Sequence, residues 1–412
     1  MLVRTCLRAV HRDERLFVAA VFLLALGLRL LYLQRILSDP GFLETGADGP
    51  VYDELAWSLA QGRDIRASFT DRFPLLLLGY VWWVSVVYRI VGHSYFLLCA
   101  TQALIGSVAC VLLYGVARRL FGILVARLAM VFTAISFPLL FAAAAIGHQA
   151  IDVCLTLFVI WLTLRALDLE RPSLWHWAGI GLALGAAIAV RETVVFLLAF
   201  IVAWLPWAFA QRRWRAAGGA IAATLLGVAV MVGPLAVPKV ATSENRTALR
   251  AHLDRLYRGE FDINLLRTGL VGPVADPIRA GRQLFADPLL VIGTLVRAYA
   301  RNLGLQFFTQ PYGGFDLVFL LKGTEYFYGL WFYVYAATVG GAVLAWRRIR
   351  AGDPSSAGLV LVAGVIAART LPHLVLESNA RHRAPIEPFL ILLAASGVVG
   401  LVVTAWRPAA RV

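Results

Sequence analysis

Long apolar segments recur along most of the chain and are separated by short polar turns. A helix needs about 20 mostly apolar residues to cross a bilayer, and residues 16–37 form the first such segment. Later segments of this kind begin near Ser94, Ile123, Ala150, Trp177, Thr193, Ala216, Glu325, Gly358 and Ile386. The pattern predicts an all-α fold, a polytopic membrane helical bundle of about ten spanning helices in one integral membrane domain over residues 1–412.

Composition supports a membrane protein and argues against a soluble one. Hydrophobic residues make up 60% of the chain and charged residues only 15%. Soluble domains have roughly 45–50% apolar and about 25% charged residues. The formal net charge of +14 comes mainly from arginines beside apolar segments, which indicates membrane topology and contact with anionic lipid, with no role for nucleic acid.

The apolar run at residues 73–91 is either a further span or a helix that lies on the membrane surface. Basic residues are enriched in the cytoplasmic segments of membrane proteins. Basic clusters occur at the amino terminus and at Arg118, Arg119, Arg127, Arg165, Arg171, Arg212, Arg213, Arg215, Arg347, Arg348, Arg350, Arg407 and Arg411. All of these clusters fall on the cytoplasmic side only if residues 73–91 do not span. We therefore predict an interfacial helix there, with both termini inside.

This topology divides the chain into membrane segments and two outer loops. The first outer loop covers residues 38–93, spans two to seven cover 94–237, the second outer loop covers 238–324, and the last three spans cover 325–406. We expect short helices at residues 247–257 and 288–302 in the second loop. Residues 177–211 are interpreted as two spans joined by an outer turn at Arg191 and Glu192, and a single kinked helix is the alternative.

Charged residues inside or beside spans are costly and usually have a partner or a function. The predicted topology gathers several of them on the outer face. Asp48, Tyr52, Asp53 and Glu54 form the first group. Its carboxylates either favour the amino terminus of a helix or supply a general base or metal ligand.

Two further groups lie in the turns after the third and fifth spans. Asp152 must face protein or a water-filled cavity, and His148 is either a hydrogen-bonded structural residue or a ligand or proton carrier. Arg191 belongs either to an internal ion pair or to a phosphate-binding site, for which its planar guanidinium is well suited.

The last group is Arg381, His382 and Arg383, directly before the final span. These side chains could reach lipid headgroups, but basic residues are disfavoured on the outer face, and an anionic ligand explains the exception. Carboxylates and arginines on one rim of a bundle fit a phosphate-bearing lipid headgroup with a hydroxyl acceptor. They also fit a transporter for an anionic solute.

The order of these features resembles the polytopic glycosyltransferases of the C superfold, particularly protein O-mannosyltransferases and the lipid A aminoarabinose transferase. Asp152 stands where members have a second acidic residue, and Val190 replaces a Thr that often precedes the basic residue at Arg191. Residues 381–389 read R-H-R-A-P-I-E-P-F, close to the R-Y-R-x-P-x-x-P-F of many members. The first-loop pattern D-x-x-x-Y-x-x-x-A-x-x-L-x-x-G is matched by Asp48, Tyr52, Ala56, Leu59 and Gly62.

The resemblance implies transfer of a sugar from a polyprenyl-phosphate carrier to a hydroxyl acceptor on a protein, lipid or polysaccharide. It implies Asp48 as the general base of an inverting reaction and Asp152 as a residue that orients the sugar or acceptor. The donor phosphate would be bound by Arg381, Arg383 and Arg191, with support from Tyr52, Asp53, Glu54, His148 and His382. The active site would lie on the extracytoplasmic face of a bacterial-type cytoplasmic membrane.

Two rival functions and one cofactor question stay open. Gly49 stands where many relatives have a second carboxylate, so no metal ligand is assigned, although a divalent metal is not excluded. The rivals are a transporter or flippase of lipid-linked sugars and a non-catalytic subunit of an envelope complex. Transporters often have two related halves with binding sites at mid-membrane, whereas these charges gather at one rim.

Overall fold

The structure is a computed structural model that describes residues 2–37, 49–63, 65, 78–209, 214–241, 324–375 and 383–405. Side chains are described within residues 13–37, 49–63, 65, 78–209, 216–234, 336–371 and 383–403. Most of the predicted second outer loop, including the helices expected at residues 247–257 and 288–302, lies outside these residues.

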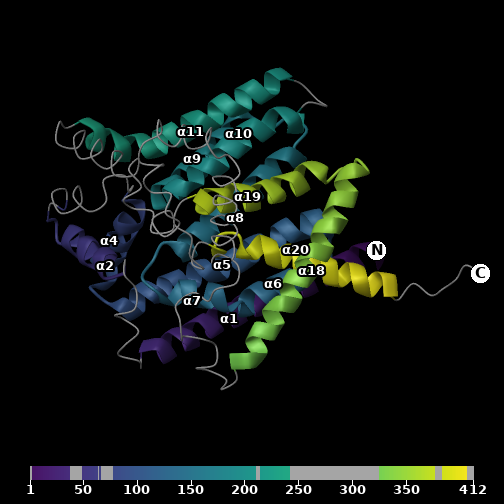
Figure 1. The fold of residues 1–412 in the computed structure, drawn as a ribbon, viewed down its shortest axis with the longest axis horizontal. Helices are drawn as coiled ribbons and strands as arrows, with labels where there is room; N and C mark the ends of the chain where they lie inside the picture. Colours follow the sequence, from purple (N-terminus) through teal and green to yellow (C-terminus); the bar gives the residue numbers. More distant parts are fainter. Residues whose placement is uncertain are drawn as a thin grey trace, which may run out of the picture.

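Every regular element in the described residues is a helix (Figure 1). In chain order they are α1 (Leu2–Leu37), α2 (Gly49–Ala60), α4 (Gly79–Val91), α5 (Tyr95–Phe121), α6 (Ile123–Ile135), α7 (Phe137–Ala144), α8 (Gln149–Asp168), α9 (Leu174–Val190), the 3-10 turn η1 (Glu192–Val194), α10 (Val195–Phe209), α11 (Trp214–Ala241), α18 (Thr324–Arg350), α19 (Ser356–Val375) and α20 (Glu387–Ala405). Each predicted span has a helix at its place, and α6 and α7 together fill the third. The all-α fold is confirmed.

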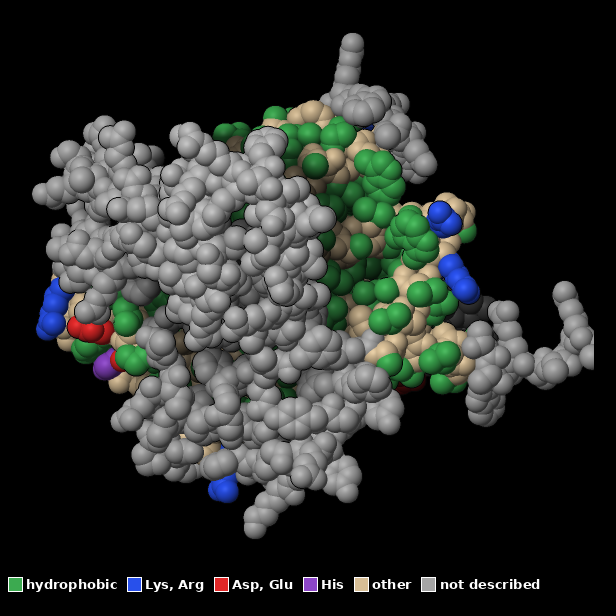
Figure 2. Space-filling model, viewed as in Figure 1, with side chains coloured by type: hydrophobic (Ala, Val, Ile, Leu, Met, Phe, Trp, Pro, Cys, Tyr) green, Lys and Arg blue, Asp and Glu red, His purple; other side chains and the backbone are tan. Residues whose placement is uncertain are grey.

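The periphery of the bundle, where the helices would face lipid, exposes many hydrophobic side chains. Figure 2 shows many hydrophobic side chains on this surface where the structure describes it, with basic side chains at its left, right and lower margins. Exposed side chains include Leu23, Leu124 and Trp175. Within the described residues, five helices are long and apolar enough to cross a membrane, or six if α6 and α7 form one span. The chain is an integral membrane protein, and the number of ten spans stays a prediction.

The third predicted span is not one straight helix. It bends by 49° between α6 and α7, at Ser136. Pro138 follows in the first turn of α7, and because proline has no N–H, it cannot bond to the carbonyl of Ala134. Arg29 of α1 compensates with two long hydrogen bonds, from Nη1 to the Ala134 carbonyl (3.4 Å) and from Nη2 to the Thr133 carbonyl (3.5 Å).

Residues 174–209 form a helical hairpin and not a single kinked helix. The ring of Phe209, at the end of α10, lies 5.7 Å from the ring of Trp177, near the start of α9. The chain therefore reverses at Arg191 and η1. Helix α9 also packs closely along α11, where Gly181 and Gly227 have no room for a Cβ atom beside the facing backbone.

The basic clusters that the structure describes lie at one end of the bundle, which we call the arginine end. Arg118 of α5 forms an ion pair with Glu14 of α1 (2.6 Å). Arg348 of α18 donates to the Leu120 carbonyl of α5 (2.8 Å), and Arg119 pairs with Asp168 of α8 (2.6 Å). The common side that the sequence predicted for these clusters is thus confirmed.

The opposite end, which we call the α2 end, carries α2, α4, the loop before α8 and the turn after α9. In Figure 1, α2 and α4 lie at the left, and the marks for both chain ends lie at the right. Helix α4 has 13 residues and so measures about 20 Å, too short to cross a hydrocarbon core of about 30 Å. This length fits the interfacial helix predicted over residues 73–91, of which residues 73–77 lie outside the described chain.

Candidate active site at the α2 end

Asp152 is the buried centre of the α2 end. It lies in the first turn of α8 and is fully buried. Its Oδ2 is ion-paired with Nη2 of Arg369 from α19, and its Oδ1 accepts a hydrogen bond from Thr156 Oγ1 (3.3 Å). Because a buried charge is tolerated only when it is well paired, this contact fixes α19 against α8.

Arg191 joins the same cluster from the turn between α9 and α10. Its Nε lies 3.9 Å from Asp152 Oδ2 and donates to Thr193 Oγ1 (3.1 Å). Arg369 Nη1 donates to the same hydroxyl (3.3 Å). Two buried arginines therefore share one carboxylate and one hydroxyl, so positive charge exceeds negative charge among these residues. Planar guanidinium groups of this kind are well suited to bind a phosphate.

A second cluster, of aromatic and polar side chains, joins α2 to the loop before α8. The ring of Tyr52 lies 5.2 Å from Tyr80 and 6.5 Å from His148. The Tyr80 hydroxyl donates to Gln102 Oε1 (3.0 Å), and Gln102 Nε2 donates to the Ala145 carbonyl (2.8 Å). Burial raises the pKa of the Tyr80 hydroxyl, so this hydroxyl stays protonated and acts as a donor. The structure thus brings Tyr52 and His148 together.

Asp53 holds α2 against α4. It accepts a hydrogen bond from the Tyr88 hydroxyl, and its Oδ2 lies 3.0 Å from His93 Nε2. Burial and the hydrogen bond with Asp53 raise the pKa of Tyr88. The His93 ring also stacks on Trp57 (4.7 Å between centroids). These contacts give Asp53 a structural role, while the neighbouring Glu54 is exposed.

Arg383 lies four positions before Glu387, the first residue of α20, and is buried. Its Nε lies 3.0 Å from Oε2 of Glu387, one helical turn later, and Glu387 is also buried. Part of the charge of Arg383 is therefore balanced within its own helix start.

Three of the predicted site residues, Asp48, Arg381 and His382, lie outside the described residues. The chain neighbour of Asp48 is Gly49, where a Cβ atom would lie 3.4 Å from the Ile146 carbonyl. The start of α2 therefore lies beside the loop that carries His148.

Sequence reasoning missed Arg369, Thr193 and Glu387 as members of these clusters. Arg369 had a usable signal, because it is a charged residue within the apolar segment of α19 and such residues seldom lack a partner. Glu387 stood in the motif before the last span without an assigned role. Thr193 had no signal, because a hydroxyl in a turn is common.

The described residues do not fit a divalent metal ion. They contain no group of three His, Cys, Asp or Glu side chains that could hold one. Both oxygens of Asp152 already accept from Arg369 and Thr156, and the adjacent guanidinium groups repel a cation.

Comparisons with known proteins agree with this architecture. Residues 77–237 match the family described as dolichyl-phosphate-mannose-protein mannosyltransferase. The matched segment runs from α4 to α11 and includes His148, Asp152 and Arg191. A comparison with curated protein sequences gives no match.

Solved structures share the fold over nearly the whole chain. The oligosaccharyltransferase of Archaeoglobus fulgidus, in its apo form, has a TM-score of 0.59 at 14% identity, over 94% of this chain and 51% of its own. The same archaeal enzyme, AglB, in complex with an inhibitory peptide and a dolichol-phosphate, also has a TM-score of 0.59, at 15% identity, over 94% of this chain and 50% of its own. ArnT from Cupriavidus metallidurans, bound to undecaprenyl phosphate, has 0.52 at 14% identity, over 95% of this chain and 63% of its own.

This chain spans about half the length of the oligosaccharyltransferase that it matches. It shares the fold of these C-type glycosyltransferases over nearly its whole length, and its segment 77–237 is similar to the mannosyltransferase family.

Proposed function

We propose that this protein transfers a sugar from a polyprenyl-phosphate carrier to a hydroxyl acceptor at the α2 end, on the extracytoplasmic side of the membrane. The observation that carries this proposal is the buried cluster in which Arg191 and Arg369 share Asp152. It supports an anion site at the end of the bundle opposite the basic clusters. The shared fold, and relatives whose structures contain dolichol-phosphate or undecaprenyl phosphate, add to this support.

Asp48 is the proposed general base. The contact of Gly49 with the loop before α8 supports this role. A catalytic group in the first outer loop, next to Gly49, would lie near His148 and the Asp152 cluster. A carboxylate at the start of a helix is stabilised in its charged form by the helix dipole. A charged carboxylate is the form that can accept a proton.

The proposed reaction is an inverting substitution at the anomeric carbon. Asp48 takes the proton of the acceptor hydroxyl while its oxygen forms a bond to the anomeric carbon. The bond between that carbon and the phosphate oxygen breaks, and its electron pair leaves with the polyprenyl phosphate. Guanidinium groups stabilise the negative charge that develops on this phosphate, and Arg191, Arg381 and Arg383 are the proposed donors.

The contacts of Asp152 support a positioning role in place of direct contact with the sugar. Its two oxygens face Arg369 and Thr156, and Arg369 and Arg191 meet at Thr193. We therefore propose that Asp152 and Arg369 hold Arg191 in the orientation that binds the donor phosphate.

The first experiment identifies the donor. Lipids from cells that lack this protein are analysed by mass spectrometry, and an accumulated polyprenyl-phosphate sugar is the expected result. Purified full-length protein is then reconstituted with that donor and a membrane extract as acceptor. Release of polyprenyl phosphate together with a glycosylated product supports a transferase. Donor movement across the bilayer without product would instead identify a flippase.

The second experiment tests the base and the phosphate ligands in the same assay. Asp48→Asn should lower turnover by about 100-fold or more, while Glu170→Gln, an exposed carboxylate at the arginine end, should keep wild-type turnover. Arg381→Ala should weaken donor binding, while Arg63→Ala, an exposed arginine at the α2 end, should not. Wild-type turnover by a correctly inserted Asp48→Asn protein removes the assignment of the base.

A further inference from the structure

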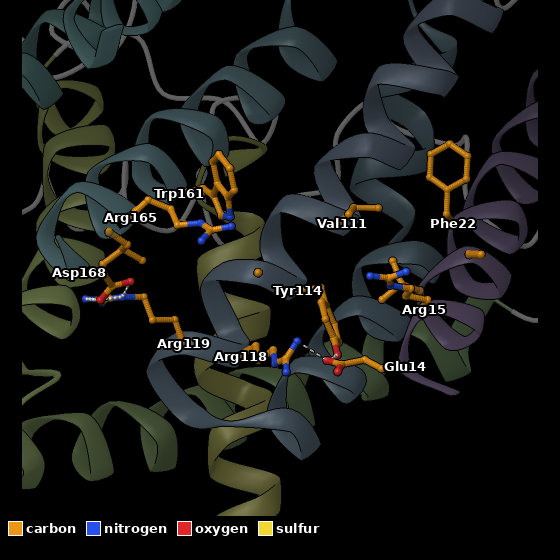
Figure 3. A pocket seen from close by; sticks show the side chains of 14 residues that line it. Glu14, Arg15, Phe22, Val111, Tyr114, Arg118, Arg119, Trp161, Arg165 and Asp168 are labelled. Carbon is orange, nitrogen blue, oxygen red and sulfur yellow. Dashed lines mark hydrogen bonds and ion pairs between the residues drawn. The ribbon is translucent and has the colours of Figure 1, made fainter. Parts of the chain in front are cut away.

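A large groove lies at the arginine end, at the far side of the bundle from the proposed active site. Figure 3 shows its lining, which comes from α1, α5 and α8. Its volume is about 950 Å³, at the upper end of the range of roughly 300–1,000 Å³ for small-molecule sites. Helix α5 forms the floor, since it packs against both α1 and α8.

The groove has more positive than negative charge. Four arginines and two carboxylates line it. Arg118 pairs with Glu14, and Arg119 pairs with Asp168. The remaining two, Arg15 and Arg165, have no carboxylate partner among the described side chains, and Figure 3 shows them on opposite sides of α5. Arg165 instead lies over the ring of Trp161 (5.1 Å). Two guanidinium groups thus remain for an anion.

The walls of the groove are apolar on the side that leads away from the arginines. On α1, Ala19 and Phe22 follow Arg15 by one and two helical turns. On α5, Val111 lies two turns before Arg118. The same face of α5 continues through Val108 and Leu104, which are 39% and 47% exposed. Apolar surface therefore runs from the charged mouth toward the middle of the bilayer.

We propose that this groove binds one anionic phospholipid. The phosphate would lie between Arg15 and Arg165, and an acyl chain would lie along Phe22, Val111 and Val108. A free anion would use the arginines but leave this apolar face without an occupant. A zwitterionic lipid would use the apolar face but gain less from the surplus positive charge. The combination of both features selects a lipid with a net negative headgroup.

The test uses purified full-length protein in detergent and native mass spectrometry. Phosphatidylglycerol and phosphatidylcholine with the same acyl chains are titrated in parallel, and inorganic phosphate is added as a competitor. Wild-type protein should retain one phosphatidylglycerol more strongly than phosphatidylcholine. Arg15→Gln/Arg165→Gln should weaken this binding by about tenfold or more, because each arginine near a lipid headgroup contributes on the order of 1 kcal/mol.

Two single variants distinguish binding of the lipid in the groove from general electrostatic attraction of an anionic lipid to the arginine end. Arg171→Gln removes an exposed charge outside the groove and should leave the affinity unchanged. Ala19→Phe keeps every charge but narrows the groove, and it should also weaken binding. Equal affinity for both lipids, equal loss with Arg171→Gln, or full affinity in Ala19→Phe would each overturn the proposal. Displacement by millimolar inorganic phosphate would point to a free anion as the occupant.

Discussion

The charged side chains at the two ends of the bundle differ in burial and in pairing. At the α2 end, Asp152 and Arg369 are 0% and 1% exposed, and two arginines share the one carboxylate. At the arginine end, each carboxylate has its own arginine, and each pair has one partner that is about half exposed: Arg118 (49%) beside Glu14 (7%), and Asp168 (50%) beside Arg119 (25%). Both ends contain ion pairs at the margin of a membrane bundle, but among the described residues both partners of a pair are buried only at the α2 end.

The difference has a physical consequence. Exposed pairs are weakened by water and salt and contribute little to stability. Buried pairs have a fixed geometry, because removing one partner leaves an uncompensated charge. The α2 end is thus the rigid one, which suits a site that must orient a phosphate and a sugar. The arginine end can adapt to lipid headgroups.

The largest effect should come from breaking the buried pair. Asp152→Asn leaves Arg369 and Arg191 without their carboxylate and should lower the free energy of unfolding by about 3–5 kcal/mol. Thermal and denaturant unfolding of the purified protein in detergent measures this loss. Asp152→Asn/Arg369→Gln removes one excess charge as well and should recover part of the stability. A loss for Asp152→Asn of under about 1 kcal/mol would contradict the contrast between the two ends.

A smaller effect is expected at Arg29, a third buried arginine. It has no carboxylate partner among the described residues and instead bonds to carbonyls at the α6–α7 bend. Arg29→Met leaves those carbonyls without a donor and should cost about 1–3 kcal/mol. The control is Arg15→Met in the same helix, where the arginine is exposed and the change should stay within about 0.5 kcal/mol. Equal losses of stability in both variants would show that the burial of Arg29 does not determine its contribution to the free energy of unfolding.

A still smaller effect is expected where α2 meets α4. Tyr88→Phe removes the hydrogen bond to Asp53 and should cost about 1 kcal/mol, because the pair is only partly buried. The change should appear as faster amide hydrogen exchange in α2 with no change in α8. Glu54→Gln, an exposed substitution in the same helix, serves as the control. Unchanged exchange in Tyr88→Phe would mean that α2 is held by its apolar contacts alone.

The smallest effect is expected for the exposed pair between Arg119 and Asp168. Asp168→Asn should change stability by about 0–1 kcal/mol, and the difference should vanish in about 1 M salt. The same unfolding assay at low and high ionic strength measures it. A large loss that persists in high salt would show that this end is as rigid as the α2 end.

Much of the fold could be predicted because its signals are local. Apolar runs marked each helix, and the positions of arginines predicted that residues 118–119, 165 and 347–350 share one side, as the structure confirms. The hairpin at Arg191 also followed from this rule, and the contact of Trp177 with Phe209 confirms it. The bend at Ser136 was missed, because Pro138 within an apolar run does not reveal whether a helix kinks or begins there.

The candidate site could be predicted only in outline. Asp152 and Arg191 were identified as charges that need partners, but the residues that satisfy them were not. Arg383 was predicted to bind the donor phosphate, and the structure shows that it also forms an ion pair with Glu387. The roles of Asp48, Arg381 and His382 remain predictions, since those residues lie outside the described chain.

Hydrophobic runs and neighbouring arginines were enough to predict the helices of the expected spans and the charges that share a side. The partners of those charges became visible only in the folded bundle. Arg369 reaches Asp152 across 217 positions of sequence, and Arg29 reaches a bend across 105. Such contacts depend on how helices pack in three dimensions, because an arginine in an apolar segment signals that it needs a partner without identifying that partner.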